Sequence, residues 1–280
     1  MPGLVRSRQG ASLHRCIMEA SKGSHKCLLF SNFTYALYTA KVLLGSVIKR
    51  ALLVYVIRRL REEINRCSDV EDYVDLSYSF HLKLMLPSII RGMFAIKPTQ
   101  IKEEIAQLLS ILAGVRPKTL LEIGTASGGT LFLFCQVAEP DAIVISVDLP
   151  GGPFGGGYPE WRIPLYKSFA KEGQRIHLIR ADSHDPKTLE IVKRILGDGK
   201  LDFLFIDGDH TYEGVKRDFE IYSPLVRKGG IIAFHDIVPG PPENVGGVPT
   251  FWNEIKWSFT YNEIVKDWQQ GGYGIGVIYV

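Results

Sequence analysis

The clearest hydrophobic pattern in the chain begins near residue 118, where short apolar runs alternate with segments of helical periodicity. The apolar runs have the length of buried strands, and polar or Gly-rich turns separate them from the helical segments. We expect strands over residues 119–123, 143–147, 176–179, 201–206 and 230–235. We expect helices near residues 128–138, 161–172, 186–196, 212–226 and 249–259. This alternation predicts a mostly parallel sheet that is covered by helices on both faces.

Two further extended runs, 262–267 and 274–280, follow one another without a long helix between them. Such a short connection suits antiparallel strands, because parallel neighbours need a long crossover. The pattern therefore predicts an α/β sheet of seven strands whose last hairpin is antiparallel. Upstream of the sheet, Thr99–Gly114 has the pattern of an amphipathic helix, with Thr99 as the N-cap residue and Gly114 as the residue that ends it.

Residues 1–98 differ in pattern from the rest, and we expect a helical extension there, ahead of a domain formed by residues 99–280. Residues 28–57 are apolar, but Lys41 and Lys49 interrupt the run, so two amphipathic helices fit better than a membrane span. These helices are expected to cover the core, to form a dimer contact or to lie on a membrane. No secretory signal is expected in residues 1–27.

The net charge of +3 conceals an asymmetry between the two parts of the chain. Residues 1–66 contain twelve basic and three acidic residues, a net of +9, which leaves −6 for the remainder. A basic arm suggests an anionic partner such as a membrane surface, another subunit or nucleic acid, and a solvated helical face is the simpler alternative. The four cysteines show no pairing or metal-binding spacing, which favours free thiols and a cytoplasmic protein.

The sequence LLEIGTASGGT at residues 120–130 joins the first strand to its helix through a Gly-rich turn. Strand, tight turn and helix in this order present backbone N–H groups to a ligand. The spacing differs from the G-x-G-x-x-G of dinucleotide enzymes, so the turn alone is also compatible with an ordinary α/β connection. Glu122 lies within the strand, and we expect its carboxylate to need a ligand ammonium or a backbone amide as partner.

Each of the five predicted parallel strands ends in acidic or imidazole side chains, and ligands bind at this edge of open α/β sheets. The later strands are followed by Asp148, by Asp182 to Asp185, by Asp207 to His210, and by the pair His235 and Asp236. Together these side chains indicate a shared cleft. An acid at the position of Asp148 suits ribose hydroxyls, in nicotinamide cofactors and in S-adenosylmethionine alike.

The strings LEIGTASGGT, SVDLP, ADSHD, FIDGDHTYEGVKRDFEIYSPLVRKGGIIAFHDI and YGIGVIYV together resemble a class I S-adenosylmethionine-dependent methyltransferase. The resemblance is nearest to the branch that contains cephalosporin-hydroxylase-like proteins and metal-dependent sugar O-methyltransferases, and it covers residues 99–280. It implies a Rossmann-like methyltransferase sheet and methylation of a small-molecule or sugar hydroxyl. The cofactor-binding residues that it implies are Glu122, Gly124, Thr125, Gly128, Asp148, Asp182 and Ser183.

The same resemblance implies a divalent metal, Mg²⁺ or Mn²⁺, bound by Asp207, His235 and Asp236, with His210 as general base. His235 stands where relatives have a carboxylate, which shifts the preference from Mg²⁺ toward Mn²⁺, Fe²⁺ or Zn²⁺ unless Asp209 supplies the missing oxygen. Aromatic side chains in the same half of the chain are candidates to stack on an acceptor or to pack in the core: Tyr158, Trp161, Tyr166 and Trp252.

Three other functions stay open at this stage. A nicotinamide-dependent oxidoreductase is disfavoured by the missing G-x-G-x-x-G motif, and a non-catalytic or hydroxylase-like protein recruited to membrane is a second alternative. A nucleic-acid methyltransferase is permitted by the basic arm, but the chain has no recognisable RNA module, so we do not expect nucleic acid as a partner. The expected partners are a small-molecule or glycan acceptor, a second copy of the chain, and a peripheral membrane contact through the N-terminus.

Overall fold

A computed structural model describes residues 48–152, 154 and 156–280, and its chain divides into two compact units, Met1–Tyr55 and Val56–Val280. Of the first unit only residues 48–55 are described, and they are helical. Most of the predicted amphipathic region 28–57, together with Cys16 and Cys27, therefore lies outside the described residues. Within the described part, no helix is both long enough and apolar enough to cross a membrane.

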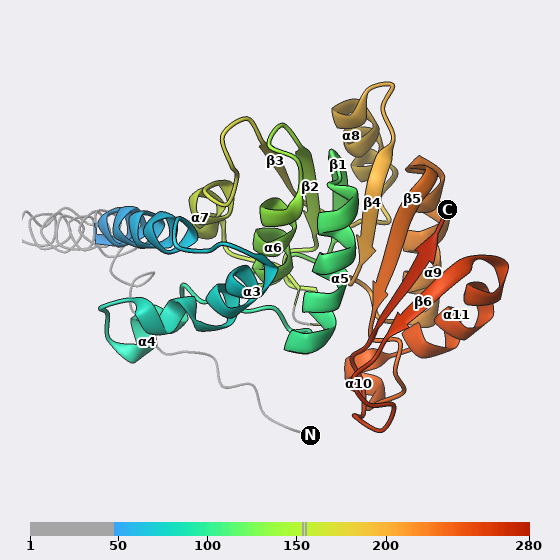
Figure 1. Ribbon diagram of the computed structural model, residues 1–280. Helices are drawn as coiled ribbons and strands as arrows, with labels where there is room; N and C mark the ends of the chain where they lie inside the picture. Colours follow the sequence, from blue (N-terminus) through green and yellow to red (C-terminus); the bar gives the residue numbers. More distant parts are fainter. Residues whose placement is uncertain (1–47, 153, 155) are drawn as a thin grey trace, which may run out of the picture. The chain divides into compact units, whose positions relative to one another are not determined.

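The second unit is built on one seven-stranded sheet with the order β3-β2-β1-β4-β5-β7-β6 (Figure 1). Its strands are β1 Thr119–Ile123, β2 Ile143–Asp148, β3 Arg175–Arg180, β4 Leu201–Ile206, β5 Val226–His235, β6 Thr260–Ile264 and β7 Ile275–Tyr279. The first five are parallel to one another, and β7 is antiparallel to both β5 and β6. The predicted mostly parallel sheet with an antiparallel last hairpin is confirmed.

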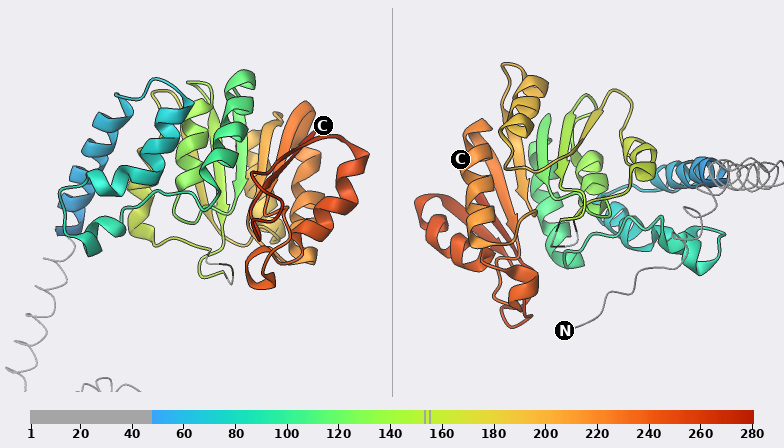
Figure 2. Two further views of the ribbon diagram at one scale, coloured as in Figure 1. Left: turned by 60° about the horizontal axis from the view of Figure 1, so that its bottom comes forward. Right: turned by 180° about the vertical axis from the view of Figure 1, so that it is seen from behind.

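Helices cover both faces of this sheet, as Figures 1 and 2 show. The longer helices are α3 Val70–Ser79, α5 Lys102–Val115, α6 Gly129–Val137, α8 Pro186–Leu196, α9 Tyr212–Tyr222 and α11 Val248–Ile255. Shorter helical turns are η1 Phe80–Lys83, α4 Ser88–Gly92, η2 Glu160–Arg162, α7 Ile163–Lys167, η3 Ser223–Leu225, α10 Pro242–Val245 and η4 Lys256–Ser258.

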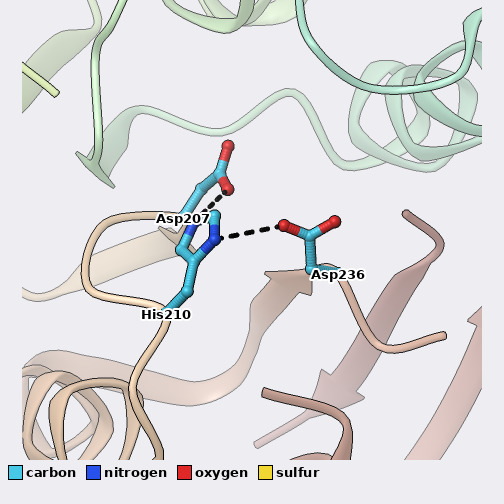
Figure 3. A group of neighbouring side chains, drawn as sticks. All are labelled: Asp207, His210 and Asp236. Carbon is cyan, nitrogen blue, oxygen red and sulfur yellow. Dashed lines mark ion pairs between the residues drawn. The ribbon is translucent and has the colours of Figure 1, made fainter. Parts of the chain in front are cut away.

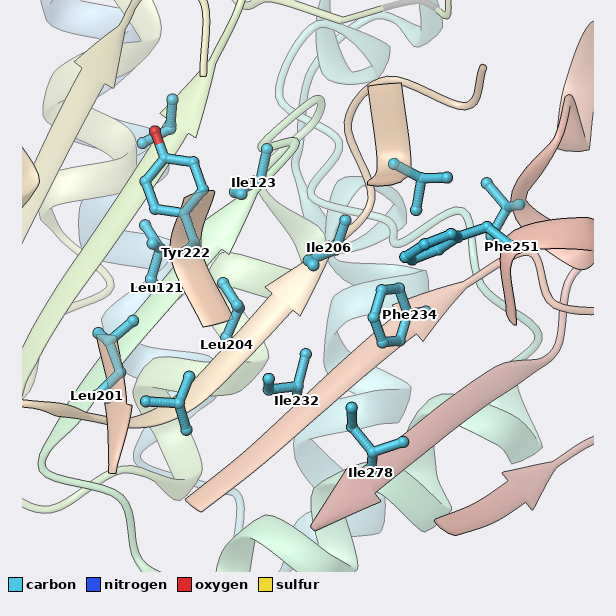
Figure 4. Packing of buried hydrophobic residues seen from close by; sticks show 14 of the residues in the cluster. Leu121, Ile123, Leu201, Leu204, Ile206, Tyr222, Ile232, Phe234, Phe251 and Ile278 are labelled. Atoms are coloured by element: carbon cyan, nitrogen blue, oxygen red, sulfur yellow. The ribbon is translucent and has the colours of Figure 1, made fainter. Parts of the chain in front are cut away.

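The two faces of the sheet are packed by different side chains, because alternate residues of a strand point to opposite sides. On one face α8, α9 and α11 bury a cluster that includes Ile206, Phe234 and Phe251 (Figure 4). On the other face Phe134 of α6 meets Phe203 and Phe205 edge-on, with ring centroids 5.1 and 5.3 Å apart. Burial on both faces explains why the parallel strands read as continuous apolar runs.

The helix before the sheet starts later than its sequence pattern predicts. Thr99 is not its N-cap residue: α5 begins at Lys102 after Ile101, which has extended backbone angles, and no side chain caps it. The preceding backbone is held extended by tertiary contacts, since the Gln100 carbonyl accepts a hydrogen bond from the Tyr78 hydroxyl at 2.5 Å. Gly114 does not end the helix either, because the left-handed residue at its C-terminus is Arg116, just before a proline.

The helix predicted over residues 161–172 is also shorter in the structure, where η2 and α7 end at Lys167. The residues that follow leave helical geometry, and their side chains donate hydrogen bonds to carbonyl groups at and just after the C-terminus of α6. The Lys171 ammonium donates to the Gln136 carbonyl at 2.6 Å, and the Gln174 amide donates to the Cys135 and Glu139 carbonyls at 2.9 Å each. Helix ends leave such carbonyls without intrahelical partners, so this competition favours the turn.

Candidate functional site

The carboxyl ends of the parallel strands surround a cavity of about 480 Å³, within the range of small-molecule sites. Strand register places the ends side by side, because Ile123 pairs with both Val147 and Ile206, and Ile206 pairs with Phe234. Of the predicted site residues, these line the cavity: Gly124, Asp148, Asp182, Ser183, Asp207, His210, His235 and Asp236. The sheet therefore brings the acidic and imidazole strand ends to one cavity, as their common position in the sequence predicts.

Gly124, the first residue of the Gly turn, has a left-handed backbone with φ of +98°. A Cβ atom at this position would overlap the carbonyl oxygen of Asp207, so the two strand ends approach too closely for any other residue. Gly128 also has a positive φ, and a Cβ there would meet the ring of Tyr166. Gly128, Thr125 and Glu122 do not line the cavity, although the resemblance assigns them to the cofactor.

Glu122 lies beneath the turn and is almost completely buried. Its carboxylate accepts hydrogen bonds from the Thr130 hydroxyl and, at 2.7 Å, from the Ser146 hydroxyl. The expectation that a ligand ammonium or a backbone amide would be its partner is wrong, because side-chain hydroxyls of α6 and β2 take that place. Burial raises the pKa of Glu122 to about 8, and the two hydroxyl donors oppose that rise without cancelling it.

Replacing Glu122 with glutamine should remove a pH dependence of stability. From its ordinary pKa of 4.5 up to about 8, folded Glu122 keeps a proton that the unfolded chain has lost. The free energy of unfolding should therefore fall as pH rises through this window, by up to about 1.4 kcal/mol per pH unit. Urea denaturation of Glu122→Gln should lack this contribution, whereas Glu172→Gln, at an exposed position, should keep it. Parallel stability profiles for Glu122→Gln and wild type would contradict the assignment.

Asp148 ends β2 and is 4% exposed. Its two carboxylate oxygens accept backbone N–H groups from both sides, from Ala126 at 2.9 Å and from Gly157 at 2.8 Å. Burial raises the pKa of Asp148, and the backbone donors oppose the rise. The carboxylate therefore fixes the Gly turn against the loop after β2, and it still faces the cavity with further lone pairs.

Next along the edge, Asp182, Ser183 and His184 form the turn after β3 and line the cavity. The His184 Nε2 atom lies 3.2 Å from Asp218 Oδ1, and Asp218 is fully buried. The hydrogen bond that the protonated ring donates to Asp218 raises the pKa of His184 against the opposing effect of burial. The Tyr222 hydroxyl donates to the Ser183 carbonyl at 2.7 Å, so α9 holds this turn from below.

The opposite end of the cavity carries a cluster of two carboxylates and two imidazoles. His210 lies between Asp207 and Asp236, with its Nε2 3.5 Å from Asp207 Oδ1 and its Nδ1 3.4 Å from Asp236 Oδ2 (Figure 3). Ligating atoms of these three residues all lie within 4.8 Å of one another, a spacing that suits a metal ion. His235 approaches the same carboxylates from below, with Nδ1 3.1 Å from Asp207 Oδ1 and 3.4 Å from Asp236 Oδ2.

The proton-accepting atom of His210 is defined by its surroundings. Its Nδ1 atom lies 2.5 Å from the Asn244 carbonyl oxygen, which can only accept, so Nδ1 carries hydrogen. Nε2, which lies 3.5 Å from Asp207 Oδ1, is therefore the ring nitrogen that can gain or lose a proton. The ring stacks on Phe154 at 4.9 Å between centroids. Burial lowers the pKa of His210, but the hydrogen bond and charge of Asp207 outweigh it and raise the pKa to about 9.

His235 is more deeply buried, and its pKa rises for the same reason. Burial alone would lower the pKa, but the charges of Asp207 and Asp236 raise it to about 10. The histidine therefore stands as an imidazolium between two carboxylates at neutral pH. Its Nε2 atom has no hydrogen-bond partner among the described residues.

Backbone strain gathers at the cavity. Of the four residues other than glycine with positive φ in the described chain, Ala126, Asp236 and Tyr273 line it. Two of them are joined directly, since the Tyr273 N–H donates to Asp236 Oδ1 at 3.1 Å. Such conformations persist where surrounding contacts enforce them, and they are common at functional sites.

Three positioning residues were not predicted from the sequence. Gln100 is 3% exposed, and its amide donates to Asp207 Oδ2 at 2.8 Å. Arg162 donates to the carbonyls of Met93, Ala95 and Ser127 at 2.6 to 3.0 Å. The local sequence gives no signal of these contacts, because Gln100 and Arg162 both have charged residues near them in the chain.

Glu104 is the third of these residues, and it is completely buried near the start of α5. Its carboxylate accepts the backbone N–H groups of Lys266 and Gly274 at 3.0 Å each and the Gln270 amide at 2.8 Å. The loop that it holds, between β6 and β7, contributes Gly271, Gly272 and Tyr273 to the cavity wall.

The predicted stacking aromatics do not line the cavity. Trp252 is 1% exposed and packs across Gly276 of β7, and its indole N–H donates to Glu263 at 2.7 Å. Tyr166 is fully buried, with its hydroxyl donating to the Ala126 carbonyl at 2.8 Å. The aromatic side chains that do reach the cavity are Phe154 and Tyr273.

The described residues that line the cavity include six carboxylates, three imidazoles and no lysine or arginine. The carboxylates belong to Asp148, Asp182, Asp207, Asp209, Asp236 and Glu243. Even with His210 and His235 protonated, negative charge exceeds positive charge. Such a lining favours a cationic ligand and disfavours a phosphate-bearing one.

Comparison with known proteins identifies the central part of this domain. Residues 121–237 match a family model described as a methyltransferase domain. An uncharacterized protein of Acanthamoeba polyphaga mimivirus, R132, is 31% identical over 160 residues, which is 55% of this chain and 62% of the relative. The uncharacterized protein y4gI of Sinorhizobium fredii is 30% identical over 149 residues, which is 52% of this chain and 16% of the relative. The chain thus spans less than two thirds of either relative.

Two solved structures share the fold at low sequence identity. An O-methyltransferase from Bacillus cereus in complex with SAH has a TM-score of 0.50 at 17% identity. The similarity covers 76% of this chain and 92% of the Bacillus cereus chain. The cofactor-bound protein Rv0187 from MTB has a TM-score of 0.51 at 16% identity, covering 74% and 89%.

Proposed function

We propose that this chain, which carries a class I S-adenosylmethionine-dependent methyltransferase domain, methylates a hydroxyl group of a small molecule or sugar. The observation that carries the proposal is the charge of the cavity, whose described lining holds six carboxylates and no lysine or arginine. S-adenosylmethionine brings a sulfonium and an ammonium group, which suit these carboxylates. A nicotinamide dinucleotide would bring a pyrophosphate, which the same lining repels, so the oxidoreductase alternative is disfavoured.

The main task of the protein in this reaction is to align the acceptor oxygen with the methyl group and the sulfur, and no covalent intermediate with the protein is needed. When bound, S-adenosylmethionine would supply a methyl group to an acceptor oxygen by in-line displacement, in which the carbon–sulfur bond breaks and the sulfur leaves as S-adenosylhomocysteine. We assign the ribose contact to Asp148 and the acceptor end to the cluster around His210. Nε2 of His210 faces the cavity side of Asp207 and can take the acceptor proton, and Asp207 stabilises the resulting imidazolium.

The cluster also fits a divalent metal, which we propose as an optional second component. Asp207, Asp236 and His210 would hold the ion, because their ligating atoms lie within 4.8 Å of one another. His235, the imidazole of the predicted set, is not one of these three residues, although its Nδ1 atom also contacts both carboxylates. A bound ion would lower the pKa of an acceptor hydroxyl. His210 has one free ring nitrogen, so a ligand role and a base role for it exclude one another.

Calorimetric titration with S-adenosylmethionine and S-adenosylhomocysteine, with and without Mn²⁺, tests the proposal. We expect micromolar affinity for S-adenosylhomocysteine, about −8 kcal/mol. A mass-shift screen of glycan and phenol acceptors then identifies the product. Absence of binding and of any thermal shift with either compound would overturn the methyltransferase assignment.

Asp148→Ala should weaken S-adenosylhomocysteine binding by about 1–3 kcal/mol, because ribose hydroxyls and two backbone N–H groups lose their acceptor. The measurement is calorimetric affinity, with the melting temperature of the unliganded protein as a check on folding. Glu160→Ala, at a largely exposed carboxylate outside the cavity, is the control and should bind normally. Unchanged affinity in folded Asp148→Ala would place the ribose elsewhere.

We also propose the cellular compartment and the partners of the protein. We assign the protein to the cytoplasm, with a small-molecule or glycan acceptor and self-association or a peripheral membrane contact through the basic N-terminus. The acidic cavity lining supports an acceptor without phosphate groups, and it gives no support to nucleic acid as substrate.

A further inference from the structure

An apolar surface whose residues do not line the cavity lies on the connection between α3 and α5. Four large apolar side chains of this connection are exposed: Leu82 at 57%, Met85 at 91%, Ile89 at 85% and Met93 at 45%. They belong to η1, to α4 and to the turns beside them. Exposed apolar side chains are ordinary when isolated, but four within twelve residues mark a contact surface. We call Leu82, Met85, Ile89 and Met93 the α4 surface.

The segment that carries the α4 surface contains basic residues and no acidic ones. Residues 80–98 contain Lys83, Arg91 and Lys97 and no acidic residue. Lys83 is paired with Glu63 at 2.7 Å, and the Lys97 ammonium lies 5.5 Å from the ring centroid of Tyr78. Among the described residues, neither Arg91 nor Lys97 forms an ion pair with a carboxylate. Apolar side chains bordered by cations are typical of segments that lie in the interface of an anionic bilayer.

The backbone that presents this surface is held firmly. Arg162 donates to the Met93 carbonyl at 2.7 Å and to the Ala95 carbonyl at 2.6 Å, and the Ser127 hydroxyl donates to the Lys97 carbonyl at 2.6 Å. Figure 1 shows α4 beyond α3, away from the sheet. The apolar side chains are therefore exposed on a fixed support, and binding needs little ordering of this segment.

A second copy of the chain is a poorer occupant of this surface. A twofold contact would place the same patch on both sides and bring Arg91 and Lys97 near their own copies without any acidic residue of residues 80–98 between them. Anionic lipid headgroups neutralise these cations, and the acyl region accepts the apolar side chains.

We propose that the α4 surface is a membrane contact, in which Leu82, Met85, Ile89 and Met93 enter the interface of an anionic bilayer. None of these four residues lines the cavity. The contact gives the domain itself an affinity for lipid.

Cosedimentation of the full chain with vesicles of phosphatidylserine and phosphatidylcholine in equal parts tests the proposal. Ile89→Glu and Ile89→Ser should each bind about fivefold to tenfold more weakly than wild type, because an exposed apolar side chain no longer enters the bilayer. Ile191→Glu, on α8, introduces the same charge at another exposed isoleucine and should bind like wild type. Vesicles of phosphatidylcholine alone should bind the wild type less.

Equal vesicle binding by wild type and both Ile89 variants would overturn the proposal and leave the membrane contact to the N-terminal segment. A change in oligomeric state of Ile89→Glu with vesicle binding unchanged would also overturn it, in favour of a second copy. Binding of S-adenosylhomocysteine by the same variants reports separately on the proposed methyltransferase function, and it should not change.

Discussion

Replacing His210 with alanine is expected to slow methyl transfer by about 10²–10⁴-fold, the usual contribution of a positioned general base. The affinity for S-adenosylhomocysteine should change little, because His210 lies at the Asp207 and Asp236 end of the cavity. The measurement is the rate at saturating cofactor with an acceptor found by the screen. His177→Ala, at a histidine of β3 that does not line the cavity, is the matched control and should keep wild-type activity.

The pH dependence of the rate distinguishes a base from a residue that merely packs. With a pKa of about 9, His210 is protonated at neutral pH, and the fraction able to take a proton grows as pH rises toward that value. The wild-type rate should therefore rise with pH up to about 9. His210→Ala should lack this limb, so its defect should widen up to about pH 9 and shrink only above it, where the acceptor hydroxyl ionises without help. Equal defects at every pH would exclude the base role.

Treatment with a chelator is expected to inactivate the enzyme if the cluster holds a divalent ion, and Mn²⁺ or Mg²⁺ should restore activity. The physical reason is that two carboxylates and an imidazole at ligand spacing attract a cation strongly. Calorimetric titration with Mn²⁺ alone gives a readout that does not depend on the acceptor. Asp236→Asn should weaken this binding, and Glu243→Gln, at a cavity carboxylate outside the cluster, should not.

The two experiments also separate the roles of His210. Full activity after chelation would remove the metal and leave His210 as the base. Inactivation together with a His210 variant that no longer binds Mn²⁺ would make it a ligand, and the acceptor proton would then need another recipient.

Most of the sheet was predictable from the sequence, because strands buried on both faces leave continuous apolar runs. The boundaries of β1 and β4 coincide with those predicted, and the antiparallel hairpin follows from the short connection before β7. The position of Asp148, Asp207 and Asp236 at one edge of the sheet was also predictable, because each ends or directly follows a strand and parallel strands end at the same edge.

What was missed depends on contacts between residues far apart in sequence. The start of α5 is set by contacts of Gln100 with Tyr78 and Asp207, which compete with the capping tendency of Thr99. Glu122 finds its donors in Thr130 and Ser146, and Trp252 is buried because Gly276 leaves room for its ring. Local pattern carries no information about such partners, so residue type alone suggested a helix cap at Thr99 and ligand contacts for Glu122 and Trp252.

The hydrogen bonds that Glu104 accepts from the loop between β6 and β7 limit the changes in length that this loop can accept. Surface loops usually accept insertions, because closing a longer loop costs little entropy. Here the carboxylate binds Lys266 and Gly274, eight positions apart, and Gln270 between them. Removing or adding one residue inside 266–274 would displace at least one donor from a buried carboxylate and shift Tyr273 in the wall. Changes of length inside this loop should therefore be poorly tolerated, despite its position between two strands at the edge of the sheet.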